Sequence, residues 1–177
     1  MFRNRGEKYI DNFVYGATDG AVTTFAVVAG AIGASLSSAI ILILGFANLF
    51  ADGFSMAVGN YLSTKSENEI YAKHKHHHHH KKDPRKTALA TFISFVLIGF
   101  IPLISFVFAP IIPAIDSHKF LYAILLTGIA FLAVGAVKGK VIEGKTCPKC
   151  ALETFLIGGI AAIIAFVVGY LLRGLAG

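Results

Sequence analysis

Long apolar runs separated by short polar stretches dominate this chain. Each run is close to the roughly 20 residues that a helix needs to cross the hydrocarbon core of a bilayer. The third run contains Pro102, which a membrane helix tolerates as a kink. The pattern therefore predicts an all-α membrane protein, a single transmembrane domain over residues 1–177 with five spanning helices. The predicted spans are 13–34, 37–61, 87–108, 120–137 and 151–172.

Composition and charge agree with a membrane protein and give it an orientation. Of 177 residues, 55% are hydrophobic and only 15% are charged, which is too apolar for a soluble domain of this size. All Lys and Arg residues except Lys119 and Arg173 lie before the first span, in 65–86 or in 138–149. Because cytoplasmic loops are enriched in Lys and Arg, the N-terminus should be cytoplasmic and the C-terminus outside or lumenal. The net charge of +6 needs no nucleic-acid partner.

Polar residues recur along one stripe of the second predicted span. Asn48, Asp52, Met56 and Asn60 are spaced four residues apart and share one side of a helix. A carboxylate at membrane depth costs at least about 2.5 kcal/mol, which favours a functional role for Asp52. Oxygen ligands beside a thioether favour a borderline transition metal over Na⁺ or Ca²⁺. Alternatively, Met56 is ordinary packing and Asn48 an interhelical hydrogen bond.

A second acid is expected at the same depth. The first two spans should form an antiparallel hairpin that turns near Ser35 and Leu36. Asp19 lies 16 residues before Ser35, and Asp52 lies 16 residues after Leu36. With a rise of about 1.5 Å per residue, the two carboxylates are level to within a residue or two. The hairpin therefore predicts either a cation site or a pair of acids that shares a proton.

Small residues flank both acids. Gly16 and Gly20 bracket Asp19 in a G-x-x-x-G spacing, and Gly53 and Gly59 follow Asp52. Such residues let helix backbones approach closely. They are expected either between two copies of the first helix in a dimer or in packing within one chain.

At these residues the chain resembles a known family. The segments 15–24 (YGATDGAVTT) and 51–67 (ADGFSMAVGNYLSTKSE) are similar to the first- and second-helix signatures of the vacuolar iron transporter family. The resemblance implies a homodimeric five-helix carrier that exports Fe²⁺, and often Mn²⁺, from the cytoplasm in exchange for protons. It implies Asp19 and Met56 as translocation ligands. Asn48 stands where better-known members carry a membrane-embedded Glu, and Asp52 is the candidate to replace that charge. Zn²⁺ and Co²⁺ are further candidate ions.

The polar segment 65–86 contains a histidine tract and two acids. Well-studied members of the family carry a long glutamate-rich metal-binding domain there, which this chain lacks. Imidazole binds several transition metals, so one interpretation is a cytoplasmic collector that feeds the hairpin site. The other is a disordered basic loop that only fixes the topology. The candidate ligands are Glu67, Glu69, His74, His76, His77, His78, His79 and His80.

The sequence Cys147-Pro-Lys-Cys150 is a second candidate metal motif. A C-x-x-C supplies half of a tetrahedral zinc site or forms a redox pair. Its predicted cytoplasmic location favours reduced thiols over a structural disulfide. A second protomer or the histidine tract could supply the two remaining zinc ligands.

Other function classes are also open. A membrane-anchored metal sensor or buffer would use the histidine tract and the C-x-x-C, while the helices only anchor it. An intramembrane aspartyl protease would use paired aspartates, but the G-x-G-D segment of such enzymes is absent before Asp19. We therefore predict a protein that is not an enzyme, with metal ions, protons and the lipid bilayer as its partners. Short loops and the absence of a targeting segment favour a prokaryotic inner membrane over an organelle.

Overall fold

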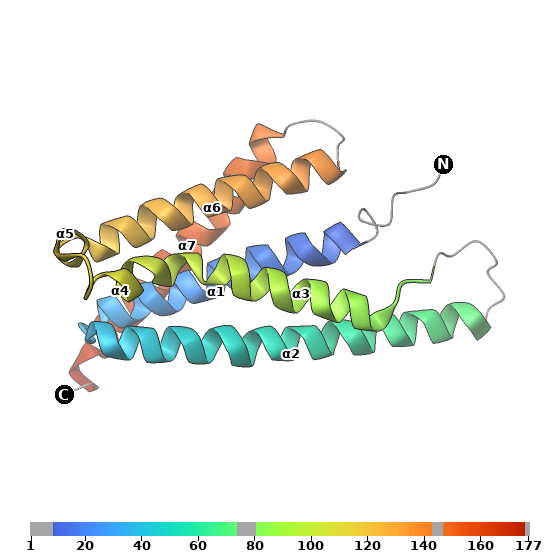
Figure 1. The fold of residues 1–177 in the computed structure, drawn as a ribbon, viewed down its shortest axis with the longest axis horizontal. Coiled ribbons are helices and arrows are strands. Elements are labelled where there is room, and N and C mark those ends of the chain that lie inside the picture. The colour runs from blue at the N-terminus through green and yellow to red at the C-terminus, as the bar shows by residue number, and fades with distance from the viewer. Residues whose placement is uncertain (1–8, 74–80, 143–146, 176–177) are drawn as a thin grey trace.

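The computed structural model describes residues 9–73, 81–142 and 147–175, and this part of the chain contains helices and no strand. Helix α1 lies at the centre of the bundle, in contact with α2, α3, α6 and α7. The start of α1, the end of α2 and the start of α3 lie at the same end of the bundle, as does the end of α6 (Figure 1). The elements are α1 (Ile10–Gly33), α2 (Ser38–Lys73), α3 (Pro84–Gly99), η2 (Ile101–Leu103), α4 (Ile104–Phe108), α5 (Pro113–Asp116), α6 (Lys119–Ile142), α7 (Pro148–Leu172) and η3 (Arg173–Leu175).

Five segments of the described chain are long and apolar enough to cross a membrane, which confirms the predicted number of spans. They are Ile10–Gly33, Ser38–Lys73, Pro84–Phe108, Lys119–Lys140 and Pro148–Leu175. Large apolar side chains are exposed on their outer faces, for example Ile129 on α6 and Ile163 on α7. Such faces suit lipid contact and not water. The protein is an integral membrane protein.

The turn between α1 and α2 lies where the sequence predicts it. Ser35 adopts φ 59°, a left-handed conformation that commonly ends a helix. The Leu36 amide donates to the Ala31 carbonyl (2.9 Å) and the Ser35 amide to the Ile32 carbonyl (2.9 Å). These bonds satisfy carbonyls at the end of α1 and reverse the chain direction. The two helices are therefore the antiparallel hairpin that the sequence predicts.

Helix α2 runs twelve residues past the predicted end of the second span at residue 61, and continues to Lys73. Hydrogen bonds to the start of α3 hold this extension. The Thr64 and Thr87 hydroxyls lie 3.1 Å apart, and the Asn68 amide donates to the Lys82 carbonyl (2.8 Å). The hydropathy pattern finds only the apolar part of a helix, so it missed the polar extension.

The third span is interrupted where the sequence predicts a kink. Asp83 caps α3 by accepting a hydrogen bond from the Arg85 amide (2.9 Å), as expected of an aspartate in that position. The helix ends at Gly99, and the 3-10 turn Ile101–Leu103 contains Pro102. Proline lacks the amide hydrogen that an uninterrupted helix needs. Helix α4 then completes the span to Phe108.

Glycines bring α1 and α3 together at backbone distance. A Cβ on Gly16 would overlap the Thr91 carbonyl oxygen, and a Cβ on Gly20 would overlap that of Phe95. Gly99 of α3 in turn lies against the Gly20 carbonyl, 2.8 Å from where its own Cβ would stand. Of the two alternatives for Gly16 and Gly20, packing within one chain is therefore the correct one, because α3 of the same chain occupies that face.

Candidate metal site

The polar stripe of α2 lies along the border of that helix's buried face. Asn48, Asp52, Met56 and Asn60 are all partly buried. The row beside them, which points into the bundle, is fully buried: Gly45, Leu49, Gly53 and Ala57. The row on their other side is exposed and consists of small residues: Ala47, Ala51, Ser55 and Gly59. The stripe is thus neither core nor fully lipid-facing.

The two acids are on the two helices of the α1–α2 hairpin, and both side chains are partly buried. They are close enough for the charge of Asp52 to act on the Asp19 carboxylate. Like charges in a weakly screening environment repel strongly, so the pair is unfavourable unless a proton or a cation lies between the carboxylates. This arrangement can bind a cation or share a proton.

Two further side chains of the stripe, Asn48 and Met56, lie four residues to either side of Asp52 on α2. The Asn48 amide nitrogen is buried and has no hydrogen-bond partner within the described part of the chain. An unsatisfied buried polar group costs about 1–3 kcal/mol, which makes Asn48 a candidate to meet a water molecule or a ligand. Met56 packs at the edge of the apolar cluster that contains Leu49 and Phe95. That contact agrees with ordinary packing and leaves the role of its sulfur a prediction.

Within the described residues, no three His, Cys, Asp or Glu side chains come together as a metal site. The described residues of one chain therefore bring together at most two carboxylates here, Asp19 and Asp52. Asn48 and Met56 stay candidate ligands.

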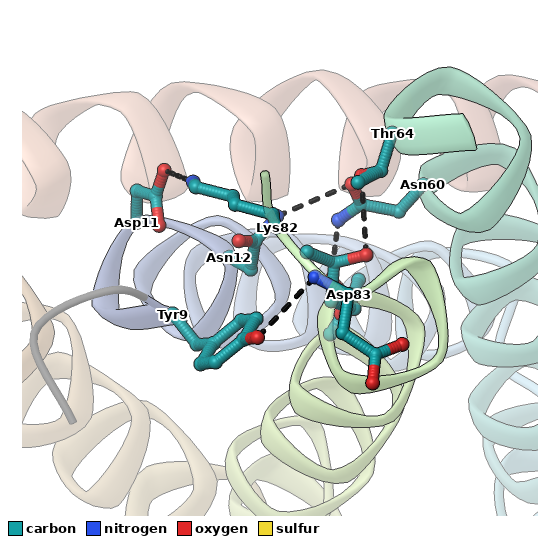
Figure 2. A network of polar contacts seen from close by, with 9 residues as sticks. Tyr9, Asp11, Asn12, Asn60, Thr64, Lys82 and Asp83 are labelled. Carbon is teal, nitrogen blue, oxygen red and sulfur yellow. Dashed lines mark hydrogen bonds and ion pairs between the residues drawn. The ribbon is translucent and has the colours of Figure 1, made fainter. Parts of the chain in front are cut away.

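A polar network joins α1, α2 and α3 near the end of the bundle where α1 begins (Figure 2). Asn60 is at its centre. The Asn12 amide donates to the Asn60 carbonyl oxygen (3.2 Å), and the Asn60 amide donates to the Thr91 hydroxyl. The side-chain oxygen of Asn12 is buried and has no hydrogen-bond partner among the described residues.

The same network continues to the ends of the helices. Lys82 pairs with Asp11, and the Asp83 amide donates to the Tyr9 hydroxyl (3.3 Å). Figure 2 shows these contacts beside the Asn60 cluster. The contribution of α1 and α3 to this network was missed from the sequence. A usable signal was present, since Thr87 and Thr91 are four residues apart on one side of an apolar helix.

The candidates in segment 65–86 are only partly within the described residues. Glu67 and Glu69 are exposed on the polar extension of α2, on a helix and not on the loop that the sequence suggested. The six histidines (His74, His76, His77, His78, His79 and His80) lie outside the described residues, so the metal collector stays a prediction.

The two cysteines form a disulfide in the structure. The expectation of reduced thiols at Cys147 and Cys150 is therefore wrong for this state, and no thiolate is free to bind zinc in it. Cys147 caps α7, and its sulfur accepts a hydrogen bond from the Cys150 amide (3.1 Å). The turn packs so tightly on α6 that a Cβ on Gly139 would overlap Cys147. The spacing that suits a zinc ligand pair also suits a disulfide at the first turn of a helix.

A family model described as the VIT family matches residues 10–82 and 72–170, most of the chain. The chain belongs to the VIT family. The match extends over all five spans, whereas the resemblance seen in the sequence was dense only over residues 11–69. The recognition of the family from two short motifs is confirmed.

Several VIT family relatives align with nearly the whole chain. Vacuolar iron transporter 1 of Eucalyptus grandis is 28% identical, over 89% of this chain and 84% of the relative. The vacuolar iron transporter of Toxoplasma gondii is 27% identical, over 98% of this chain and 78% of the relative. Vacuolar iron transporter homolog 4 of Arabidopsis thaliana is 31% identical, over 86% of this chain and 78% of the relative.

The names of these relatives bear on two predictions. They describe transporters, which confirms that this VIT family chain is not an enzyme. The expectation of a prokaryotic inner membrane gains no support from them, since the matched relatives are named for the vacuole.

Proposed function

We propose that this VIT family protein transports divalent transition metals, exporting Fe²⁺ from the cytoplasm in exchange for protons, with Mn²⁺ as a second substrate. The observation that carries the proposal is the placement of two partly buried acids, Asp19 and Asp52, on the two helices of one hairpin, each long and apolar enough to span a membrane. The names of the relatives support iron as the substrate. The proton and the metal ion are the two cations that would relieve the repulsion between these acids.

The proposed cycle alternates between those two occupants. A metal ion that arrives from the cytoplasm displaces protons from Asp19 and Asp52 and is bound between α1 and α2. The Asn48 amide then contacts the ion: its oxygen can bind the metal, and its nitrogen, which has no partner among the described residues, can donate to an ion-bound water. The Met56 thioether adds a soft ligand that favours Fe²⁺ over Mg²⁺ or Ca²⁺. Protonation of the carboxylates on the opposite side of the membrane releases the ion.

We also propose that the transporter is a homodimer whose two α2 helices face each other. One chain supplies only two carboxylates, so a second copy would complete the coordination of the ion. The row of small residues beside the stripe, Ala47, Ala51, Ser55 and Gly59, is exposed and would let a partner helix approach closely. A Cβ on Gly59 would meet nothing within 4 Å, so this face has room for a partner. The face of α1 that carries Gly16 and Gly20, the alternative place for a partner, is occupied by α3.

Metal flux into proteoliposomes tests the function directly. With a pH gradient, the wild type should carry Fe²⁺ and Mn²⁺ and move protons in the opposite direction. Asp19→Asn and Met56→Ala should lose most of the Fe²⁺ flux, because each removes one proposed ligand. The Asp19→Asn substitution also leaves the size of the side chain almost unchanged. Asp116→Asn is the matched control, since Asp116 is exposed and pairs only with Lys119 (2.9 Å) in the described structure. Undiminished flux in Asp19→Asn would refute the ligand assignment.

A further inference from the structure

Two kinds of contact hold the α1–α2–α3 group together, and they differ in rigidity. Between α1 and α3, glycines meet backbone carbonyls: Gly16 against Thr91, and Gly20 against Phe95. Backbone atoms in helices cannot move aside separately, so α1 and α3 must move as one body. Their ends are also joined by the Lys82–Asp11 ion pair.

Helix α2 is attached to this pair differently. Its Gly53 meets flexible side chains of α3 and not backbone: a Cβ on Gly53 would stand 3.0 Å from the Phe95 ring. Farther along α2, Gly45 likewise meets only a side chain, that of Leu103 in η2. Side chains can change rotamer or slide past one another at low cost. The boundary between α2 and the α1–α3 pair, which we call the α2 seam, is therefore the boundary that can shift.

The polar bonds of the network cross the α2 seam. Asn60 of α2 accepts from Asn12 of α1 and donates to Thr91 of α3. One turn farther along α2, Thr64 bonds to Thr87 of α3. Interhelical hydrogen bonds within a membrane are individually weak, so a few of them can hold the α2 seam closed and still break during a transport cycle.

The acids lie across the same seam, with Asp19 on α1 and Asp52 on α2. Asn60 follows Asp52 by eight residues, and Asn12 precedes Asp19 by seven. At about 1.5 Å per residue the Asn12–Asn60 bond is therefore some 10–12 Å from the acids along the helices. It lies between the acids and the end of the bundle that carries most of the Lys and Arg residues.

We propose that α2 moves against a rigid α1–α3 pair during transport, and that Asn60 is the latch that closes the Lys-rich side of the α2 seam. An ion reaching the acids from that side must first separate Asn60 from Asn12 and Thr91. The free carbonyl oxygen of Asn12 then offers the passing ion a neutral ligand. This inference rests on the proposed transport function, but its first test needs no transport assay.

Hydrogen exchange of the full chain in nanodiscs gives that first test. Asn60→Ala removes both bonds of the latch and leaves the acids in place. Exchange should rise at least several-fold in α2 between residues 56 and 72, with α1 and α3 unchanged. The matched control is Val58→Ala, an exposed position on α2 outside both the network and the proposed dimer face, which should not alter exchange. Equal increases of hydrogen exchange in α2 and α3, or unchanged exchange in α2, would contradict the proposed role of Asn60 as a latch.

Crosslinking then connects the latch to transport. In a Cys147→Ser/Cys150→Ser background, the pair Asn12→Cys/Asn60→Cys is joined by a short bifunctional thiol reagent, which should block metal flux until the link is reduced. The control is the pair Asp11→Cys/Lys82→Cys, joined by the same reagent. This link ties α1 to the segment just before α3, within the rigid pair, and should leave metal flux unchanged. Full flux with the α2 seam crosslinked would contradict the inference even if Asp19 and Asp52 are the transport ligands. If the cysteine-free background carries no metal, the hydrogen-exchange result alone decides.

Discussion

At the scale of single residues, the sequence was most informative where a polar group is costly. Asp19 and Asp52 stood out because an acid within an apolar span needs a reason to be there, and the structure places both, partly buried, on the two helices of one hairpin. Glycine was less informative. A glycine pattern indicates that another backbone approaches closely, but the identity of that neighbour depends on the tertiary fold. The sequence therefore left two possible partners for Gly16 and Gly20, and the structure shows that the partner is α3.

A glycine substitution measures how tightly α1 meets α3. Gly20→Ala should destabilise the protein by about 1–3 kcal/mol, because its Cβ would overlap the Phe95 carbonyl. Gly159→Ala is the control, since a Cβ there meets nothing within 4 Å and alanine is the better helix former by roughly 0.5–1 kcal/mol. Thermal unfolding in one detergent compares the two variants. Equal stability of both would mean that the α1–α3 contact is not rigid.

At the scale of elements, hydropathy predicted the apolar part of each helix but not its polar ends. Helix α2 continues to Lys73 because Thr64 and Asn68 find partners near the start of α3, and such partners come from tertiary structure. The break at Pro102 was predictable, since the ring removes a backbone donor wherever it falls. The disulfide was not, because a C-x-x-C suits a disulfide and a metal equally well.

Two substitutions at Cys147 separate its role as a helix cap from its disulfide. Both Cys147→Ser and Cys147→Ala remove the disulfide, but serine can still accept a hydrogen bond from the Cys150 amide. The alanine variant should therefore be less stable than the serine variant by about 1 kcal/mol. Thermal unfolding under reducing and non-reducing conditions provides the comparison. A wild type that is unaffected by reductant, with both variants equal to it, would show that this turn adds nothing to stability.

At the scale of the whole molecule, five spans and their order were predictable because the bilayer fixes the length of each helix. The arrangement of those helices was not, and in particular the central position of α1 among α2, α3, α6 and α7. The hydrophobic periodicity of the sequence indicates little of this helix arrangement, because apolar side chains face both the core and the lipid. The candidate site was predictable in its acids but not in the network at Asn60, whose partners come from three helices.

Orientation is a prediction of the whole molecule. Because almost all Lys and Arg residues lie on one side, an epitope tag at the N-terminus should face the cytoplasm and one at the C-terminus should face the opposite compartment. Protease digestion of sealed membranes of known sidedness shows directly on which side each tag lies. Protection of both tags on the same side would contradict an odd number of spans.

The central claim is that Asp19 and Asp52 hold a single divalent ion between them. Anaerobic Fe²⁺ binding to the purified protein in nanodiscs, compared among wild type, Asp19→Asn, Asp52→Asn and the double variant, tests it most directly. If one ion contacts both carboxylates, the losses of Fe²⁺-binding free energy in the two single variants do not add up to the loss in the double variant. The expected coupling free energy between the two residues is about 0.5–3 kcal/mol. Losses of binding free energy that add to within roughly 0.5 kcal/mol would show that the two acids act independently, and would contradict the proposed shared ion.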